Sequence, residues 1–289
     1  MASDRLTFHA APNLHDTRMI LGFSGWMDGG DVSTGTVKCL ADKLHAKPLA
    51  EIDPEGFYLL NFPGSMEISA LFRPHTKIEG GLIGEYRNPT NAFFYSEENN
   101  LIAFVGREPN FHWTRYAECI FQVASQFQVS RIYFIGSVAG AVPHTREPRL
   151  SCSVSAEPLK ETMQQYGVRF SDYEGPASLC TYLTVLAPKR GCEMVNLVAE
   201  IPAYVQGRNL RCIESVTRRL AGILGLRVDL DDLRALSDRL EEKLNEAMEK
   251  RPELAERIHE LEADYDNEVF DTQMDDLKDW LQQQGIRLD

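Results

Sequence analysis

Residues 131–146 combine the pattern of a buried strand with polar side chains capable of chemistry, reading RIYFIGSVAGAVPHTR. The apolar run 132–135 predicts a strand that is covered on both faces of a sheet. The small residues that follow, from Gly136 to Ala141, would let a ligand approach the backbone closely. In open α/β sheets, ligands bind beyond the carboxyl ends of the strands. We therefore predict a candidate site directly after this strand.

Two kinds of chemistry fit the polar residues near this strand. Ser137, His144 and Asp28 would supply the nucleophile, base and orienting carboxylate of a hydrolytic triad. The sequence lacks the Gly-x-Ser-x-Gly elbow, and a small serine after a buried strand more often serves packing. His144 and Arg146 would instead bind an anion, with the guanidinium forming a fork for a carboxylate or phosphate. A loop tied by its backbone hydrogen bonds is the alternative.

A glycine-rich turn at residues 24–31 follows another predicted strand, at 19–23. A helix begins after the turn, and we expect Asp31 or Ser33 to cap it. The unit resembles a phosphate cradle in outline, but it has neither G-x-G-x-x-G nor the P-loop lysine. A tight crossover turn is the alternative. Because this turn and residues 136–146 both follow buried strands, we expect them to meet at one edge of the sheet.

Other loop residues extend the candidate site. Glu108 and Glu174 precede predicted helices, where a carboxylate either caps the helix or performs acid–base chemistry. Trp26 and Trp113 line a pocket or belong to an aromatic core. The seven histidines show no H-x-H or H-x-x-x-H spacing, so we expect no metal site. We also expect no cofactor. The candidate ligand-binding residues are Trp26, Asp28, Gly29, Glu108, Asn110, Gly136, Ser137, Gly140, His144 and Arg146.

Strand and helix patterns alternate through most of the chain. This predicts an α/β fold with three α/β/α layers and a mostly parallel, mixed central sheet. The strand at 132–135 should be central in that sheet. A long helix is expected at 113–127, and a hairpin at 77–87 with Gly80 and Gly81 in its turn.

The charge is unevenly distributed along the chain, whose net charge is −13. Residues 229–289 hold 20 acidic and 8 basic residues, whereas residues 1–228 hold 23 and 22. We predict a near-neutral α/β body at 1–228 and an acidic helical extension at 229–289 that carries no chemistry. The body has no basic surface of the kind that neutralises phosphates, so we expect no nucleic-acid partner.

The cysteines and the apolar runs bear on localisation. The six cysteines are scattered without metal-ligand spacing, which favours reduced thiols in the cytoplasm. The N-terminus runs into no apolar signal core. We expect no membrane association, because no apolar run approaches the roughly 18 residues of a membrane span.

The acidic extension carries narrow apolar stripes at helical spacing. Three helices are expected, with Pro252 between the first and the second and a stop near Gly285. The stripes must pack either on the body of the same chain or on a neighbouring subunit. They comprise Leu233, Leu236, Leu240, Leu244 and Met248, then Leu254, Ile258, Leu261 and Tyr265, and finally Phe270, Met274, Leu277 and Leu281.

The motifs, taken in order, resemble those of the bacterial branch of the proteasome assembly chaperone 2 family. The matching blocks span residues 20 to about 230, and their number and order make the likeness specific. They are GWMDGG at 25–30, DPEGFY at 53–58, EPNFHW at 108–113, GSVAG at 136–140, VPHTR at 142–146, YEGP at 173–176 and IPAYV at 201–205.

The resemblance carries expectations of its own. It implies an α/β/α body similar to the phosphorylase/hydrolase-like fold of purine nucleoside phosphorylases, and a homo-oligomer, with a trimer favoured. Eukaryotic relatives help to assemble the α-ring of the proteasome, and some archaeal ones bind it through a C-terminal hydrophobic-Tyr-X tail. This sequence has Leu288 where that tyrosine would stand. Docking by that route is therefore not expected, and the resemblance assigns no catalytic residues.

Three functions follow from these observations. The first is a non-catalytic, assembly or chaperone-like oligomeric protein with a possible protein partner. The second is a small-molecule-binding protein, or a hydrolase/phosphorylase-like enzyme, that uses a crevice at the carboxyl edge of the sheet. The third and weakest is an ATP-dependent carboxylate–amine ligase, for which no glycine-rich nucleotide loop is visible. A closed polar pocket formed by 26–30, 108–113 and 136–146 would favour the second.

Overall fold

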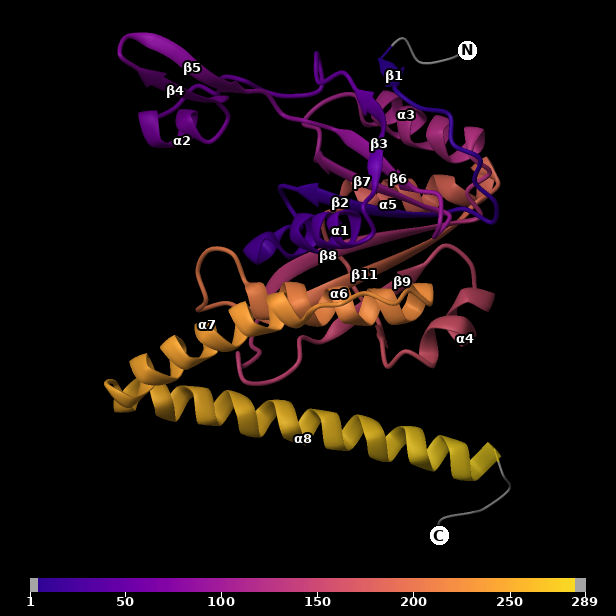
Figure 1. Cartoon of the computed structure of the whole chain (residues 1–289). Helices are drawn as coiled ribbons and strands as arrows, with labels where there is room; N and C mark the ends of the chain where they lie inside the picture. Colours follow the sequence, from indigo (N-terminus) through magenta and orange to yellow (C-terminus); the bar gives the residue numbers. More distant parts are fainter. Residues whose placement is uncertain (1–4, 284–289) are drawn as a thin grey trace.

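The computed structural model describes residues 5–283, and a nine-stranded mixed sheet forms the centre of the protein (Figure 1). Its four middle strands run parallel, and the strands on both sides of them add antiparallel pairs. The strands, in spatial order, are β1 (Leu6–Phe8), β3 (Lys47–Ile52), β6 (Ala92–Ser96), β7 (Leu101–Arg107), β2 (Arg18–Ser24), β8 (Arg131–Gly140), β11 (Glu193–Pro202), β9 (Leu150–Val154) and β10 (Arg169–Phe170).

Helices cover both faces of this sheet. One face packs on α3 (Trp113–Gln126) and α5 (Leu179–Leu186), and α5 continues into the short 3₁₀ helix η2 (Ala187–Arg190). The other face packs on α1 (Val32–Lys43), α4 (Pro158–Gln164) and α6 (Leu210–Leu224). Successive residues of one strand enter opposite cores, as Phe134 and Ile135 of β8 do. The predicted three-layer α/β/α fold with a mostly parallel, mixed sheet is confirmed.

Strand β8 has the central place predicted for 132–135, between β2 and β11. All four residues of that run are buried. The strand is longer than the apolar run indicated, because Gly136 to Gly140 continue it in register with residues 198–202 of β11. The small residues expected to follow the strand are therefore its last part.

A buried serine stabilises the point where β2 and β8 separate. Their ladder ends at the pair Gly22 and Ile135. Beyond it, the Ser33 hydroxyl accepts a hydrogen bond from Phe23 N (3.1 Å) and donates one to the Ile135 carbonyl. Gly22 allows this close packing, because a Cβ there would lie 2.8 Å from the Ser33 carbonyl oxygen. Helix α1 is thus fixed directly over the diverging strands.

The start of α1 differs from the prediction. Asp31 stands at the N-cap position in the left-handed region (φ 53°) and makes no capping bond with its side chain. Asp28 performs this role instead, since its carboxylate accepts hydrogen bonds from Thr34 N (3.0 Å) and Thr34 Oγ1 (2.8 Å). The 3₁₀ turn η1 (Gly29–Asp31), with Gly30 at φ 61°, lies between Asp28 and the helix. The distance along the sequence from Asp28 to Thr34 is therefore longer than in a standard N-cap.

Residues 60–87 form an arm that projects from the body (Figure 1). The arm contains the short helix α2 (Met66–Ala70) and the predicted hairpin, β4 (His75–Glu79) and β5 (Leu82–Arg87), which turns at Gly80 and Gly81. These two strands pair only with each other in the described structure and make a separate sheet. The hairpin is confirmed, but it does not join the main sheet.

The acidic C-terminal segment forms a helical hairpin of α7 (Asp231–Glu249) and α8 (Pro252–Gln283). The break before Pro252 is confirmed. Two further helices were expected after this break. They form one helix instead, because α8 is continuous through residues 265–270. Leu233 and Ile258 of the predicted stripes are buried, whereas Leu236 is 48% exposed. The expected stop near Gly285 and the side chains of Leu277 and Leu281 lie outside the described residues.

Two features of the described residues concern the environment of the protein. No helix among residues 5–283 is both long and apolar enough to cross a membrane. The six cysteines carry thiols rather than disulfides, and five of them are buried. Burial raises the pKa of the Cys152 and Cys212 thiols to about 12, so they stay protonated at neutral pH.

Replacing the serine that joins α1 to the sheet should lower stability. Ser33→Ala leaves a buried amide and a buried carbonyl without their partner, which costs about 1–3 kcal/mol. Urea unfolding followed by circular dichroism measures the change in the free energy of unfolding. Ser125→Ala, at an exposed position of α3, is the control and should change stability by less than about 0.5 kcal/mol. An unaffected Ser33→Ala protein would contradict this role.

Candidate functional site

The loops that follow β2, β7 and β8 meet at the carboxyl edge of the sheet, since the three strands are parallel. Asp28 and Ser137 form an isolated parallel bridge, and Ser137 N donates to the Met27 carbonyl (2.9 Å). Glu108 N donates to the Ser24 carbonyl (2.9 Å), which joins the β7 loop to the β2 loop. The turn at 24–31 and residue 137 therefore lie side by side, as the two strand ends suggested.

The polar groups at the centre of this edge are engaged in structural bonds. The Ser137 hydroxyl, in a residue that is 1% exposed, donates to the Gly29 carbonyl at 2.8 Å. The Asp28 carboxylate caps α1 through Thr34. Burial raises the pKa of Asp28 above its usual value, and the hydrogen bonds from Thr34 oppose that rise. Neither group is presented to a ligand as a nucleophile or a base.

His144 is buried on the other side of the edge, between the end of β11 and helix α7. Its backbone N–H donates to the Tyr204 hydroxyl (2.7 Å), which lies 2.8 Å from Nδ1. Nε2 lies 3.4 Å from Asn245 Oδ1. A neutral ring with its hydrogen on Nε2 satisfies both partners, since the tyrosine hydroxyl then donates to Nδ1. Burial lowers the pKa of His144; nearby Arg211 acts in the same direction, and Asn245 and Glu262 oppose it.

The three residues of the proposed triad thus bond to different partners. In the described contacts the Ser137, Asp28 and His144 side chains each bond elsewhere, and no hydrogen bond joins two of them. The arrangement lacks the nucleophile–base bond by which such a triad is recognised. Their contacts stabilise loops instead.

Glu108 and Asn110 also stabilise the fold. Glu108 Oε1 accepts a hydrogen bond from Leu179 N (2.8 Å) at the start of α5, beside the Ser178 cap. Asn110 Oδ1 accepts from Leu59 N (3.0 Å) and so ties the β7 loop to the root of the arm. Glu108 therefore caps a helix, although the helix is α5 rather than the one that follows it in sequence.

The two glycines of β8 among the candidates are required by packing. A Cβ at Gly136 would lie 2.8 Å from the Phe134 ring and 3.3 Å from Met27 Cε. A Cβ at Gly140 would lie 3.3 Å from Glu200. Trp26, by contrast, is 67% exposed, so the alternative that placed it in an aromatic core is wrong. Trp113 is half-buried against the core and donates from Nε1 to the Pro109 carbonyl.

Cavities of useful size lie away from this edge. The hollow next to His144, which Arg211 and Leu240 also line, has a volume of about 10 Å³, which is about one water molecule. Hollows of about 530 and 560 Å³ lie beside the α6–α7 connection and beneath α8. Within residues 5–283, no group of three or more metal-ligating side chains is placed to hold an ion.

Arg146 binds the C-terminal helix of its own chain. Its guanidinium makes a two-pronged ion pair with Asp266 (2.9 and 2.8 Å) and lies 3.6 Å from Glu262. The neighbouring Thr145 hydroxyl donates to Glu262. The Arg146 guanidinium thus has the two-pronged geometry predicted for binding an anion, and the anion is a carboxylate of α8.

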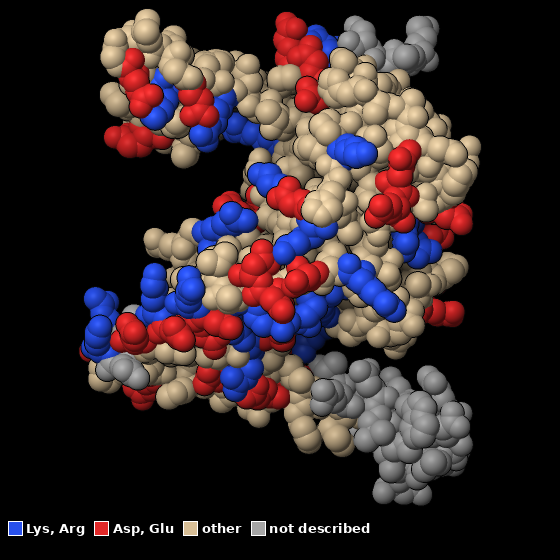
Figure 2. All heavy atoms as spheres, in the orientation of Figure 1, with Lys and Arg blue, Asp and Glu red and all other residues tan. Residues whose placement is uncertain are grey.

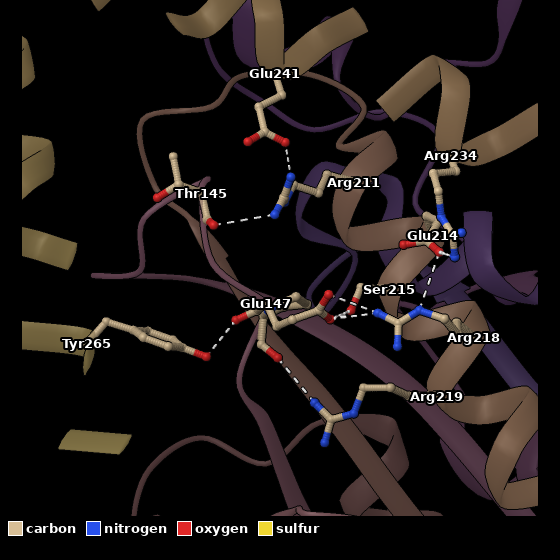
Figure 3. Close-up of polar contacts among 11 residues, drawn as sticks. Thr145, Glu147, Arg211, Glu214, Ser215, Arg218, Arg219, Arg234, Glu241 and Tyr265 are labelled. Atoms are coloured by element: carbon tan, nitrogen blue, oxygen red, sulfur yellow. Dashed lines mark hydrogen bonds and ion pairs between the residues drawn. The ribbon is translucent and has the colours of Figure 1, made fainter. Parts of the chain in front are cut away.

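The rest of the loop at 143–149 continues this contact. We call the whole contact the latch: the ion pairs and hydrogen bonds that join residues 143–149, Arg169 and Arg211 to α7 and α8. Figure 3 shows the part of it formed by Thr145, Glu147, Arg211, Glu241 and Tyr265. The Tyr265 hydroxyl donates to the Glu147 carbonyl (2.9 Å), and Arg149 stacks on the Tyr265 ring at 4.6 Å. Arg149 and Arg169 both pair with Glu268, and Arg211 pairs with Glu241 of α7.

The body holds the same loop from the other side. Glu147 accepts from Ser215 and from Arg218 of α6, the latter at 2.8 and 2.9 Å (Figure 3). Arg219 donates to the carbonyls of Pro148 and Gly167. The acidic extension therefore packs on the body of its own chain, which is one of the two arrangements that its stripes allowed.

Sequence reasoning missed most of the residues that make this contact. Tyr204 was visible within the block at 201–205, and Tyr265 within an apolar stripe, but no spacing rule links them to 143–149. The one usable signal was the charge split, since an acidic segment favours ion pairing with arginines elsewhere in the chain.

The sequence matches the model of the PAC2 family over residues 22–248. That match covers more than half of the chain. The chain belongs to the PAC2 family. The resemblance to proteasome assembly chaperones is thereby confirmed at the level of the family. No protein of curated function matches the sequence.

Solved structures share the fold. A proteasome-assembly chaperone homologue of Mycobacterium tuberculosis is 25% identical, with a TM-score of 0.72 over 84% of this chain and 100% of that chain. A Mycobacterium tuberculosis protein of unknown function has a TM-score of 0.82 at 18% identity and covers 96% of this chain and 94% of its own. An archaeal proteasome activator of Pyrococcus furiosus has a TM-score of 0.63 at 20% identity, covering 84% and 97%.

Neutralising the acids of the latch should loosen α8. Asp266→Asn with Glu268→Gln removes two α8 carboxylates, one paired with Arg146 and the other with Arg149 and Arg169, at little change in shape. We expect amide exchange in residues 252–270 to speed up several-fold, and high salt to have the same effect on the unmodified protein. Glu260→Gln, on an exposed part of the same helix, is the control. Unchanged exchange in the double variant would mean that the ion pairs of Asp266 and Glu268 do not hold α8.

Stability should fall in mild acid because of His144. Its pKa is lower in the folded protein than in the unfolded chain, so the unfolded chain binds the proton more tightly. The free energy of unfolding should therefore hold above about pH 6.5 and decrease as the pH drops below it. His144→Gln should flatten that decrease in urea titrations between pH 7 and pH 5, whereas His259→Gln, at an exposed position, should not. A slope that is the same in all three proteins would exclude His144 as its source.

Proposed function

We propose that this PAC2 family member is a non-catalytic, assembly-chaperone-like protein that acts by binding other proteins in the cytoplasm. One observation carries the proposal. At the carboxyl edge, where an α/β enzyme would place its chemistry, the polar groups of Asp28, Ser137 and Glu108 are engaged in holding loops and helices together. Apolar groups such as Trp26 and Phe111 face solvent there. An edge of that kind suits contact with a protein surface better than chemistry on a small molecule.

Two of the relatives support this proposal through their own roles. One is described as a proteasome-assembly chaperone homologue and another as an archaeal proteasome activator. Both descriptions concern contact with a multi-subunit protein assembly. We propose that this chain also acts on a multi-subunit protein assembly. The proposal includes a homo-oligomeric state, with a trimer favoured. It also includes a cytoplasmic location, which the buried thiols favour.

The other two functions find no support in these observations. An enzyme using a crevice would need a pocket that gathers reactive groups, and the candidate groups bond to separate partners. A carboxylate–amine ligase would need a nucleotide-binding loop. In the 24–31 turn, Asp28 instead caps α1 and forms the bridge to Ser137.

The division into a body at 1–228 and an extension at 229–289 is proposed on the same basis. Helix α6 ends at Leu224 and α7 begins at Asp231, so the boundary falls in the connection between them. The latch gives the extension a structural role that needs no chemistry. Leu288 stands where the tyrosine of the hydrophobic-Tyr-X tail would be, and it lies outside the described residues. That the protein does not dock on a proteasome through such a tail stays a prediction.

Mixing the protein with separately purified proteasome α and β subunits tests the proposal. We expect the rate at which complete core particles form, followed by native electrophoresis and peptidase activity, to change with the amount of this protein. Bovine serum albumin at equal concentration is the control. If neither the rate nor the yield responds, and no complex with either subunit forms in size-exclusion chromatography, the proposed function is wrong.

A further inference from the structure

Helix α8 crosses the end of the sheet without filling the space beneath it. A hollow of about 560 Å³ lies there, and Tyr265 and Val269 of α8 form one of its walls. The other walls belong to the body and include residues 147–150, the strand β10 and Arg219 of α6. Small-molecule sites typically have volumes of about 300–1,000 Å³. The hollow is therefore large enough for a ligand of that class.

Three arginines from separate elements line this hollow: Arg149 before β9, Arg169 at the start of β10 and Arg219 on α6. Figure 2 shows basic and acidic side chains gathered side by side over the lower part of the molecule, where α6, α7 and α8 lie. The Arg149 side chain is 13% exposed, and its Cζ lies 4.6 Å from the centre of the Tyr265 ring. Its Nε is buried and has no hydrogen-bond partner among the residues that the structure describes. A buried donor of this kind calls for an acceptor.

Arg219 bonds to neutral acceptors within the described part of the chain. Its guanidinium donates to three backbone carbonyls, those of Pro148, Tyr166 and Gly167. The carboxylate of Glu147, which also lines the hollow, pairs with Arg218 instead, at 2.8 and 2.9 Å (Figure 3). Burial lowers the pKa of Arg219, and the nearby charge of Glu147 opposes that change only in part. The positive charge of Arg219 is therefore incompletely compensated.

The carboxylates beside the hollow do not balance its arginines. Arg149 lies 3.6 Å from Glu200 and also pairs with Glu268 of α8, which in turn pairs with Arg169. The three guanidinium groups thus share two carboxylates. A phosphate monoester carries about −1.5 to −2 charges at pH 7 and offers three acceptor oxygens. A phosphate in place of Glu268 would therefore balance the three arginines, which a single carboxylate does not.

The remaining walls of the hollow are apolar. Val168 and Phe170 contribute side chains from the body, and Val269 contributes one from α8. All three are half-buried. A free phosphate ion would occupy only a small part of 560 Å³ and would leave these side chains uncovered. Burying apolar surface is favourable, so the walls suit an organic group attached to the phosphate.

We propose that the hollow beneath α8 binds a phosphate monoester, with the phosphate held by Arg149, Arg169 and Arg219 and the organic group against Phe170 and Val269. The phosphate takes the place of Glu268, which acts as an internal substitute for the ligand. Because Glu268 belongs to the latch, binding weakens the hold of the body on α8. The site lies away from the carboxyl edge, and it adds a small ligand to a protein proposed to bind other proteins.

Isothermal titration calorimetry of the full chain with phenyl phosphate tests the site, at about pH 7, where the ester is mostly a dianion. Inorganic phosphate and phenol supply the two halves of this probe separately. We expect phenyl phosphate to bind at least about tenfold more tightly than inorganic phosphate, because its ring leaves water on binding. Phenol should give no binding at the same concentrations, because it has no charge for the arginines.

Two substitutions should shift this affinity in opposite directions. Arg169→Gln, at a side chain that is 31% exposed, should weaken binding at least about tenfold through the loss of charge-assisted hydrogen bonds. Glu268→Gln should strengthen binding several-fold, because it removes the competing carboxylate. Arg190→Gln, at an exposed arginine of η2 outside the hollow, is the matched control and should leave the affinity unchanged. Circular dichroism confirms folding, and Arg169→Lys replaces Arg169→Gln if that variant unfolds.

Other results would overturn the proposal. No binding of phenyl phosphate at millimolar concentration would exclude the site. Equal affinities for phenyl phosphate and inorganic phosphate would show that the apolar walls take no organic group. An unchanged affinity in Arg169→Gln would place the ligand elsewhere, and weaker binding by Glu268→Gln would show that the phosphate does not replace this carboxylate. These results are independent of the assembly of core particles, which tests the proposed function separately.

Discussion

The separation of β2 from β8 at the sheet centre is the constraint on which the rest of the structure depends. The two strands pair up to Gly22 and Ile135, and beyond that point each loses a hydrogen-bonding neighbour. Ser33 supplies both missing bonds from α1. Because buried backbone groups must be paired, this one hydroxyl sets where the strands diverge and how close α1 lies to the sheet. The loops at the carboxyl edge start from that geometry.

The same requirement explains why residues suited to catalysis perform structural work here. Once β2 and β8 diverge, the 24–31 turn needs attachment, and Asp28 and Ser137 provide it through Thr34 and the Gly29 carbonyl. Glu108 meets an equivalent need at the start of α5. A carboxylate that accepts a helix N–H is already committed, and using it as a base would release the helix end. The edge is thereby a rigid surface.

Charge and apolar contact divide the remaining surface between them. The acidic extension pairs with the arginines of 143–149, Arg169 and Arg211. Few of its described apolar side chains are buried, among them Leu233 and Ile258. The arm is the opposite case: it is neutral, it exposes large apolar side chains, and it projects from the body (Figure 1). A PAC2 family chain built in this way covers its basic surface internally and keeps an apolar one for association.

The sequence alone determined the layers, the central strand, the hairpin at Gly80 and Gly81, and the acidic character of the last segment, because apolar periodicity, turn residues and composition are local properties. Tertiary structure decided the partners. Asp28 rather than Asp31 caps α1, and the arm stands apart from the main sheet. Arg146 pairs with Asp266, which lies 120 residues away in the sequence. Local sequence patterns contain no information about such partners. Trp26 shows the same limit: its residue type favours burial, but the bridge between Asp28 and Ser137 fixes the turn that holds it in solvent.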